Sequence, residues 1–225
     1  MKYIEKVFFV VALFVATAGT TWAAAYDDSI NAAKMGDVAK LGELLSQGLL
    51  PDTVDENGNS LLILAAREGN VDTVDLLLRA GAKPGYRNPA GDSALAVAAL
   101  KGAEPVVDRL LAAGAPVGAD GWSPLIYAAF EGHLAIVRKL VERGAPIDQL
   151  APNKASALMF AARNGHIDVV RFLLEHGADA TLVNDRGRTA RSWALENANT
   201  DIAAMIDEHL KRQGITPKPL KLIIE

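Results

Sequence analysis

Apolar residues follow two alternating helical patterns along most of the chain. In one pattern they recur every three or four positions, as at Val71, Val74, Leu77 and Leu78, which predicts a helix that buries a single face. In the other, residues 61–66 form a short apolar segment that ends in paired alanines, which predicts a thin helix that its neighbours can approach closely. A glycine separates the two patterns, and a turn-rich linker follows them. The sequence therefore predicts an all-α chain of helix–turn–helix units.

These units recur at a nearly constant spacing. The glycines between the two helices are separated by 33, 33, 30 and 33 residues, and they are Gly36, Gly69, Gly102, Gly132 and Gly165. The same intervals separate the glycines that follow the second helix, which are Gly48, Gly81, Gly114, Gly144 and Gly177. Since both series share one three-residue shortening, they belong to one repeat. A single unit could not bury its apolar face alone, so we expect one cooperative stack.

Polar residues mark where each first helix begins. Hydroxyl residues stand where an N-cap accepts unpaired backbone N–H groups, and they are Ser60, Ser93, Ser123, Ser156 and Thr189. Pro124 follows one of them at the first helical position, where its missing N–H costs nothing.

Two stretches resemble the ankyrin repeat family closely. Residues 123–145 contain Ser-Pro-Leu-Ile-Tyr-Ala-Ala, then Gly-His and a final Gly-Ala pair, and residues 163–179 read Arg-Asn-Gly-His-Ile-Asp-Val-Val-Arg-Phe-Leu-Leu-Glu-His-Gly-Ala-Asp. The resemblance covers about residues 27–210. It implies an ankyrin repeat solenoid with projecting hairpin-like fingers, within an ankyrin domain at 27–212. We number its six units as repeats one to six: 27–54, 55–87, 88–117, 118–150, 151–183 and 184–212.

The chain departs from the family pattern at several places. Repeat one lacks the usual start of the first helix, which is expected of an N-terminal cap. Repeat six has Arg191 where a packing leucine is usual and Ala198 where a glycine is usual, which we interpret as a solvated end cap. Lys154 replaces a finger glycine, and the finger between repeats three and four is three residues short. A tail at 213–225 follows, which we expect to be disordered or to lie as a strand on repeat six, or else to add a strand to a partner.

The N-terminal segment differs from the repeats in composition. Two lysines precede an apolar run at 7–18, and small residues follow it, as in a secretory signal peptide. The run is too short for an ordinary membrane span of about 20 residues. We therefore predict a signal peptide at 1–23, cleaved near Ala23 or Ala25, and a periplasmic location with no stable membrane span after cleavage. An uncleaved N-terminal anchor is the alternative.

Composition and charge exclude several function classes. The 225 residues are half apolar, contain no cysteine and carry a formal net charge of -4 without a basic cluster, which argues against thiol chemistry and nucleic-acid binding. His133 and His166 occupy the same repeat position, which indicates a structural role. No metalloprotease, phosphate-loop or serine-hydrolase motif occurs. We expect no enzymatic activity, cofactor, metal or small-molecule substrate, and a monomer that binds a protein.

The resemblance implies that partners contact the finger tips and the exposed ends of the first helices on the concave surface. The candidate partner-binding residues are Arg67, Leu100, Lys101, Trp122, Phe130, Glu131, Arg163 and Asn164. Trp122 and Phe130 are large aromatics at positions that are usually exposed, as interface anchors are. Alternatively, the short finger lets Trp122 fold back and cover Phe130. Aromatics at one shared inner position are expected to lie in the core, and they are Tyr127, Phe160 and Trp193.

Two functions fit this interpretation. The first is a scaffold that binds proteins in the periplasm. The second is an inhibitor or immunity protein that neutralises one toxin or hydrolase there. Both would use the same rigid surface, so the sequence does not choose between them.

The signal-peptide prediction can be tested by locating the mature N-terminus. We expect the mature chain to begin near Ala24 or Tyr26 and to appear in the osmotic-shock fraction. Mass spectrometry of the purified protein measures this directly. Intact Met1 on a cytoplasmic protein would contradict the prediction.

Overall fold

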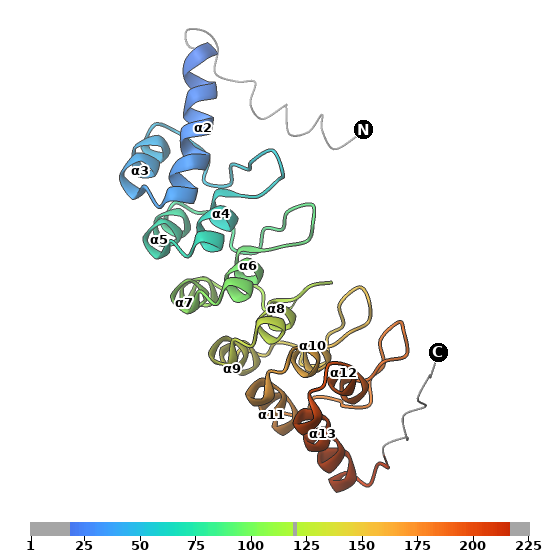
Figure 1. The fold of residues 1–225 in the computed structure, drawn as a ribbon. Coiled ribbons are helices and arrows are strands. Elements are labelled where there is room, and N and C mark those ends of the chain that lie inside the picture. Colours follow the sequence, from blue (N-terminus) through green and yellow to red (C-terminus); the bar gives the residue numbers. More distant parts are fainter. Residues whose placement is uncertain (1–18, 119–120, 217–225) are drawn as a thin grey trace.

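The computed structural model describes residues 19–118 and 121–216, which form a curved stack of helix pairs (Figure 1). The first helices of the pairs, here called inner, are α2 (Gly19–Met35), α4 (Leu61–Glu68), α6 (Ala94–Lys101), α8 (Pro124–Glu131), α10 (Ala157–Asn164) and α12 (Ala190–Glu196). The second, outer helices are α3 (Val38–Ser46), α5 (Val71–Arg79), α7 (Glu104–Ala112), α9 (Leu134–Glu142), α11 (Ile167–Glu175) and α13 (Thr200–Arg212). The predicted all-α repeat solenoid is confirmed.

Each inner helix from α4 onward begins at its predicted cap. The Ser60 hydroxyl oxygen accepts a hydrogen bond from the backbone N–H of Ile63 at 3.2 Å. The equivalent bond is present at the other caps, which are Ser93, Ser123, Ser156 and Thr189. These bonds satisfy backbone donors that a helix start leaves unpaired, so they fix the register of every repeat.

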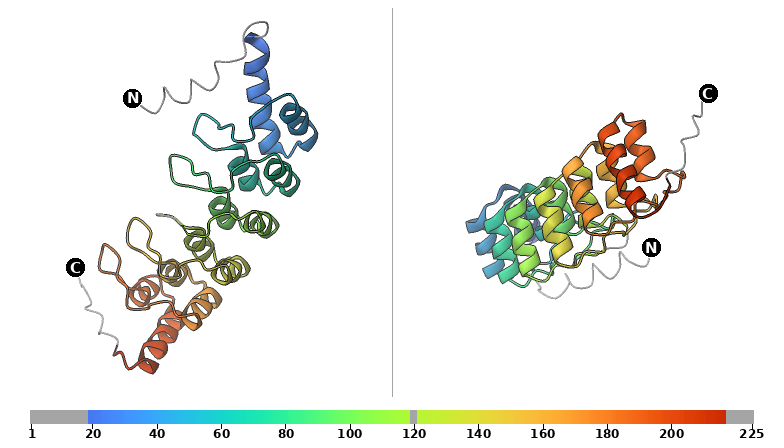
Figure 2. Two further views of the ribbon diagram at one scale, coloured as in Figure 1. Left: turned by 180° about the vertical axis from the view of Figure 1, so that it is seen from behind. Right: turned by 90° about the horizontal axis from the view of Figure 1, so that it is seen from below.

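The inner helices form the centre of the core. The first six residues of α4, α6 and α10 are all buried, whereas an outer helix such as α7 buries a single stripe of Val106, Val107, Leu110 and Leu111. Consecutive inner helices contact each other more extensively than consecutive outer helices do. The stack therefore curves toward the inner side, from which the fingers project (Figure 2).

Side chains at the start of the outer helices bind neighbouring repeats together. Asn70 donates from Nδ2 to the carbonyl of Lys34 at 3.0 Å, and Asn199 donates to the carbonyl of Arg163 at 2.9 Å. At the same position, His166 Nε2 lies 2.9 Å from the carbonyl oxygen of Phe130. The predicted structural role of this histidine follows from that bond, which occupies a carbonyl at the end of the preceding inner helix.

The linkers between repeats form the predicted fingers, which we number one to five: 49–59, 82–92, 115–122, 145–155 and 178–188. Of finger three, the structure describes residues 115–118 and 121–122. Fingers one, two and four each close through an isolated antiparallel bridge, such as Val54 with Ser60. Finger three is the short one, and Arg87 of finger two donates to its Gly118 carbonyl at 3.1 Å. Lys154 has φ 59°, so it adopts the left-handed conformation of the glycine it replaces.

The two ends of the chain differ from the internal repeats. α2 begins at Gly19, inside the predicted signal peptide, whose residues 1–18 lie outside the described part, as do residues 217–225 of the predicted tail. The end-cap interpretation of Arg191 is wrong in one respect. Its side chain is half-buried and pairs with Asp207 of α13 instead of facing solvent. Of the helices described, none is long and apolar enough to cross a membrane.

Gly132→Val tests the repeat register. Gly132 has φ 79°, and a Cβ there would lie 2.4 Å from His166 Nδ1. We expect the strained backbone alone to lower the free energy of unfolding by about 1–3 kcal/mol, measured by urea titration. Gly144→Val is the matched control, because Gly144 has φ 81° with open space around its Cβ. The Gly132 variant should be the less stable one, and equal losses would mean that His166 does not pack there.

Candidate functional site

The sequence-predicted binding residues lie along the inner side of the stack. All but one occupy the last two positions of the consecutive inner helices α4, α6, α8 and α10. The exception is Trp122, which precedes the α8 cap. Lys101, Glu131, Arg163 and Asn164 are exposed, and the other four are half-buried: Arg67, Leu100, Trp122 and Phe130. Because the earlier positions of these helices are mostly buried, the helix ends and fingers form the accessible part of this concave surface.

Hydrogen bonds connect the fingers at the N-terminal half of this surface. Asn59 donates from Nδ2 to the Asp55 carboxylate at 3.0 Å, and its Oδ1 accepts from Arg67 Nη2 at 3.2 Å and Asn88 Nδ2 at 2.8 Å. Asn88 Oδ1 in turn accepts from the backbone N–H of Asp92 at 2.8 Å. We call this series the polar ladder. It fixes finger one to finger two through side chains that are themselves largely buried.

The polar ladder continues into repeat four through Tyr127. The Tyr127 hydroxyl donates to the Asp92 carboxylate at 3.0 Å. Burial, together with this bond, raises the pKa of Tyr127 to about 12, because both disfavour the phenolate. Burial opposes ionisation of Asp55, but hydrogen bonds from Asn59 and Asn57 outweigh it and lower the pKa of Asp55. In the polar ladder, the Asp55 carboxylate therefore accepts hydrogen bonds, and the Tyr127 hydroxyl donates one.

An aromatic cluster occupies the C-terminal half. Phe160 is 2% exposed and lies at its centre, with ring centroids 5.1 Å from Trp122, 5.8 Å from Phe130 and 5.6 Å from Trp193. Trp122 also stacks on Tyr127, with a centroid separation of 5.3 Å. The prediction that these inner aromatics lie in the core holds for Phe160, whereas Tyr127 and Trp193 are half-buried. Trp122 packs on Tyr127 and Phe160, so the alternative in which it covers Phe130 assigned the wrong neighbour.

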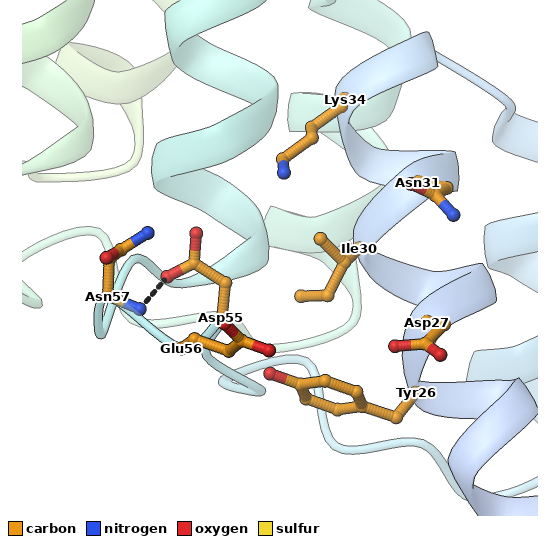
Figure 3. Close-up of a pocket in the computed structure, with 8 residues that line it drawn as sticks. All are labelled: Tyr26, Asp27, Ile30, Asn31, Lys34, Asp55, Glu56 and Asn57. Atoms are coloured by element: carbon orange, nitrogen blue, oxygen red, sulfur yellow. Dashed lines mark hydrogen bonds between the residues drawn. The ribbon is translucent and has the colours of Figure 1, made fainter.

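A cleft between α2 and finger one lies at the N-terminal end of the concave surface (Figure 3). Its volume is about 380 Å³, and Asp27, Asp55 and Glu56 face it together with a single cation, Lys34. Burial and these carboxylates raise the pKa of Tyr26, which also lines the cleft. Sequence analysis missed this acidic cleft, because the distance between α2 and the finger does not follow from residue spacing.

A smaller cleft lies at the other end, between fingers four and five. Its volume is about 180 Å³, and its lining residues are Asn153, Arg163, Asn184, Asp185, Arg186 and Trp193. The Arg163 guanidinium lies over the Trp193 ring, 5.4 Å from its centroid. We call this smaller cleft, between fingers four and five, the C-terminal cleft. Of its residues, only Arg163 was among the predicted binding residues.

The concave surface presents side chains that can contact another molecule. Within residues 19–118 and 121–216, no group of three or more His, Cys, Asp or Glu side chains could hold a metal ion. His133 and His166 each use Nε2 on a backbone carbonyl of the preceding repeat, at 3.3 and 2.9 Å. What the surface offers is a row of charged, amide and aromatic side chains on a rigid support.

Comparison with known proteins identifies the repeats. A family model described as ankyrin repeats (3 copies) matches residues 29–117 and again 62–151, and a second, described as ankyrin repeats (many copies), matches 140–194. The chain belongs to the ankyrin repeat family. Ankyrin repeats form protein–protein interaction modules and are typically non-catalytic, so this chain is an interaction module by its fold.

Two solved structures each contain a chain that is similar to this one over most of its length. The crystal structure of the human ASB11 ankyrin repeat domain has a TM-score of 0.74 and 26% sequence identity, covering 80% of this chain and 82% of that one. A chain in the complex of the predatory endopeptidase Bd0816 from Bdellovibrio bacteriovorus with the immunity protein Bd3460 has a TM-score of 0.73 and 30% identity. That match covers 80% of this chain and 97% of that one. No curated protein matches the sequence significantly.

Trp122→Ala separates packing from binding in this ankyrin surface. Because Trp122 contacts two rings, we expect the free energy of unfolding to fall by about 3 kcal/mol, as for truncation of a buried aromatic. Urea titration measures this without knowledge of the partner. Exposed Glu131→Ala is the control and should stay within about 0.5 kcal/mol. If stability is unchanged and affinity for a partner falls by about 2 kcal/mol, Trp122 contributes to binding without supporting the aromatic cluster.

Proposed function

We propose that this protein is a non-enzymatic module that binds a partner protein through its concave surface. The observation that carries the proposal is the one-sided exposure of the inner helices, whose early positions are mostly buried while the helix ends and fingers remain accessible. These accessible positions carry Arg163, Trp122 and Phe130, which are residue types that anchor interfaces. The contact residues we propose are the eight named from the sequence.

We also propose that the module acts in the periplasm. The support is the N-terminal pattern of lysines, an apolar run and small residues, which favours export and cleavage near Ala23 or Ala25. The exported compartment permits disulfides, but the sequence contains no cysteine. The repeat stack would therefore be stable there through packing and hydrogen bonds alone. A scaffold that holds one or several periplasmic proteins is the function we favour.

A second function is supported by one specific comparison. The similar chain in the endopeptidase–immunity protein complex shares 30% identity, and the match spans 97% of its length. An inhibitor or immunity protein would bind one toxin or hydrolase tightly with the same concave surface. A rigid curved surface of this kind suits such a role, because preorganisation lowers the cost of binding.

Exchange of two charges on the concave surface tests the binding proposal. Lys101→Glu combined with Glu131→Lys keeps the net charge, and both residues are exposed. We expect recovery of co-purified periplasmic proteins on the tagged variant to fall about tenfold or more, because like charges then face each other across the interface. The matched control is Glu142→Lys with Arg143→Glu, both exposed at the end of outer helix α9.

The same experiment distinguishes the two functions. One tight enzymatic partner whose activity disappears in the complex supports the inhibitor, whereas several weaker partners support the scaffold. Equal recovery on wild type and the concave variant, together with a loss on the outer-helix control, would contradict the use of the concave surface.

A further inference from the structure

The same two donor side chains occur at equivalent positions twice, once from repeats two and three and once from repeats five and six. Arg67 and Arg163 each stand seven residues after the N-cap of their inner helix, and Asn88 and Asn184 each stand five residues before the next N-cap. The chain thus provides an internal comparison for these donors. Because the donors are identical, any difference in their hydrogen bonding comes from the neighbouring residues.

Where repeats two and three meet, both donors share one acceptor. Asn59, the residue before the N-cap, uses Oδ1 to accept from Arg67 Nη2 at 3.2 Å and from Asn88 Nδ2 at 2.8 Å. Asn59 is buried, with 5% of its surface exposed, so its oxygen is enclosed by the two donors. The polar groups of this site are therefore satisfied within the protein, as buried polar groups normally are.

In repeat five, the shared acceptor is missing from the sequence. Ala155 occupies the position of Asn59 and carries no polar group. Asn184 is 4% exposed, and its Nδ2 makes no hydrogen bond within the described residues. Burying an unpaired amide donor is unfavourable, because the group loses its hydrogen bonds to water. Asn184 is one of the residues that line the C-terminal cleft.

Arg163 also differs from its counterpart. Its side chain is exposed and lies over the Trp193 ring, with no hydrogen bond or ion pair found for the guanidinium in the part of the chain that the structure describes. A guanidinium stacked on a ring keeps its N–H edge available for a planar acceptor. Arg186 lines the same cleft, so two cations face the single carboxylate of Asp185.

We propose that the C-terminal cleft binds a carboxylate side chain of the partner protein. Its oxygens would accept hydrogen bonds from Arg163 and Asn184, in the role that Asn59 Oδ1 has toward Arg67 and Asn88. A carboxylate fits better than a neutral amide, because the cleft has an excess of positive charge and charge-assisted hydrogen bonds are the stronger ones. The inference rests on the proposed function and specifies what one end of the concave surface recognises.

A titration with a small probe tests the cleft without the partner. The probe is N-acetyl-glutamate α-amide, and its neutral control is N-acetyl-glutamine α-amide. With ¹⁵N-labelled protein, we expect saturable shifts of the Asn184 side-chain amide, Arg163 Nε–H and Trp193 indole N–H signals with the carboxylate probe only. Arg67 and Asn88 are the internal reference and should not shift, because their acceptor is in place. Equal shifts with the neutral probe, or at both pairs of donors, would overturn the proposal.

Two variants sharpen the test. Ala155→Asn restores the internal acceptor and should weaken binding of the carboxylate probe about tenfold, the equivalent of one charge-assisted hydrogen bond. Arg163→Gln should weaken it by a similar factor and does not depend on repacking a buried site. Arg143→Gln, an exposed arginine at the end of α9, is the control and should bind the probe like wild type. Loss of less than twofold in Arg163→Gln would overturn the proposal, whether or not Ala155→Asn folds.

The outcome can be separated from that of the proposed function. If the partner is recovered equally by wild type and Arg163→Gln, the concave surface binds proteins but the cleft does not recognise a carboxylate of that partner. If wild type recovers no partner while the probe titration succeeds, the donor geometry is right and the proposed function is wrong.

Discussion

The close approach of neighbouring inner helices determines the geometry of the whole stack. The alanine pairs Ala65–Ala66 and Ala98–Ala99 have no exposed surface, and their small side chains allow adjacent repeats to touch along the inner side. The outer helices pack through larger valine and leucine residues and contact one another less. The stack therefore curves toward the inner side, and the fingers project from it (Figure 1). Larger residues in place of these alanines would force the inner helices apart and change the curvature on which the concave surface depends.

The concave surface has two chemically different halves, which meet at the shortened finger. Hydrogen bonds between amide and carboxylate groups fix fingers one and two, whereas a cluster of rings around Phe160 supports the C-terminal half. Tyr127 belongs to both, because its hydroxyl binds Asp92 and its ring stacks on Trp122. The three-residue shortening thus coincides with the change from polar to aromatic support. The two clefts lie at opposite ends of this surface and differ in charge.

Much of the fold was predictable because it depends on local signals that recur. A hydroxyl cap such as Ser60 and a glycine such as Gly132 act within their own turn of the chain, so their spacing reveals the helices directly. Contacts between separate elements were harder to predict. The pairing of Arg191 with Asp207 and the packing of Trp122 on Phe160 depend on distances between helices, which the sequence does not contain. The same limit explains why the two clefts, formed between separate elements, were missed.

The polar ladder also affects how a partner would dock. Fingers are loops, and loops commonly lose conformational entropy when a partner fixes them. Here a hydrogen bond between Asn59 and Asn88 connects fingers one and two in the free protein. The conformational entropy of these fingers is therefore already lost during folding. Each immobilised side chain otherwise disfavours association by about 0.5–1.5 kcal/mol. Recognition at this end should therefore resemble rigid docking, with selectivity set by the shape that the partner presents.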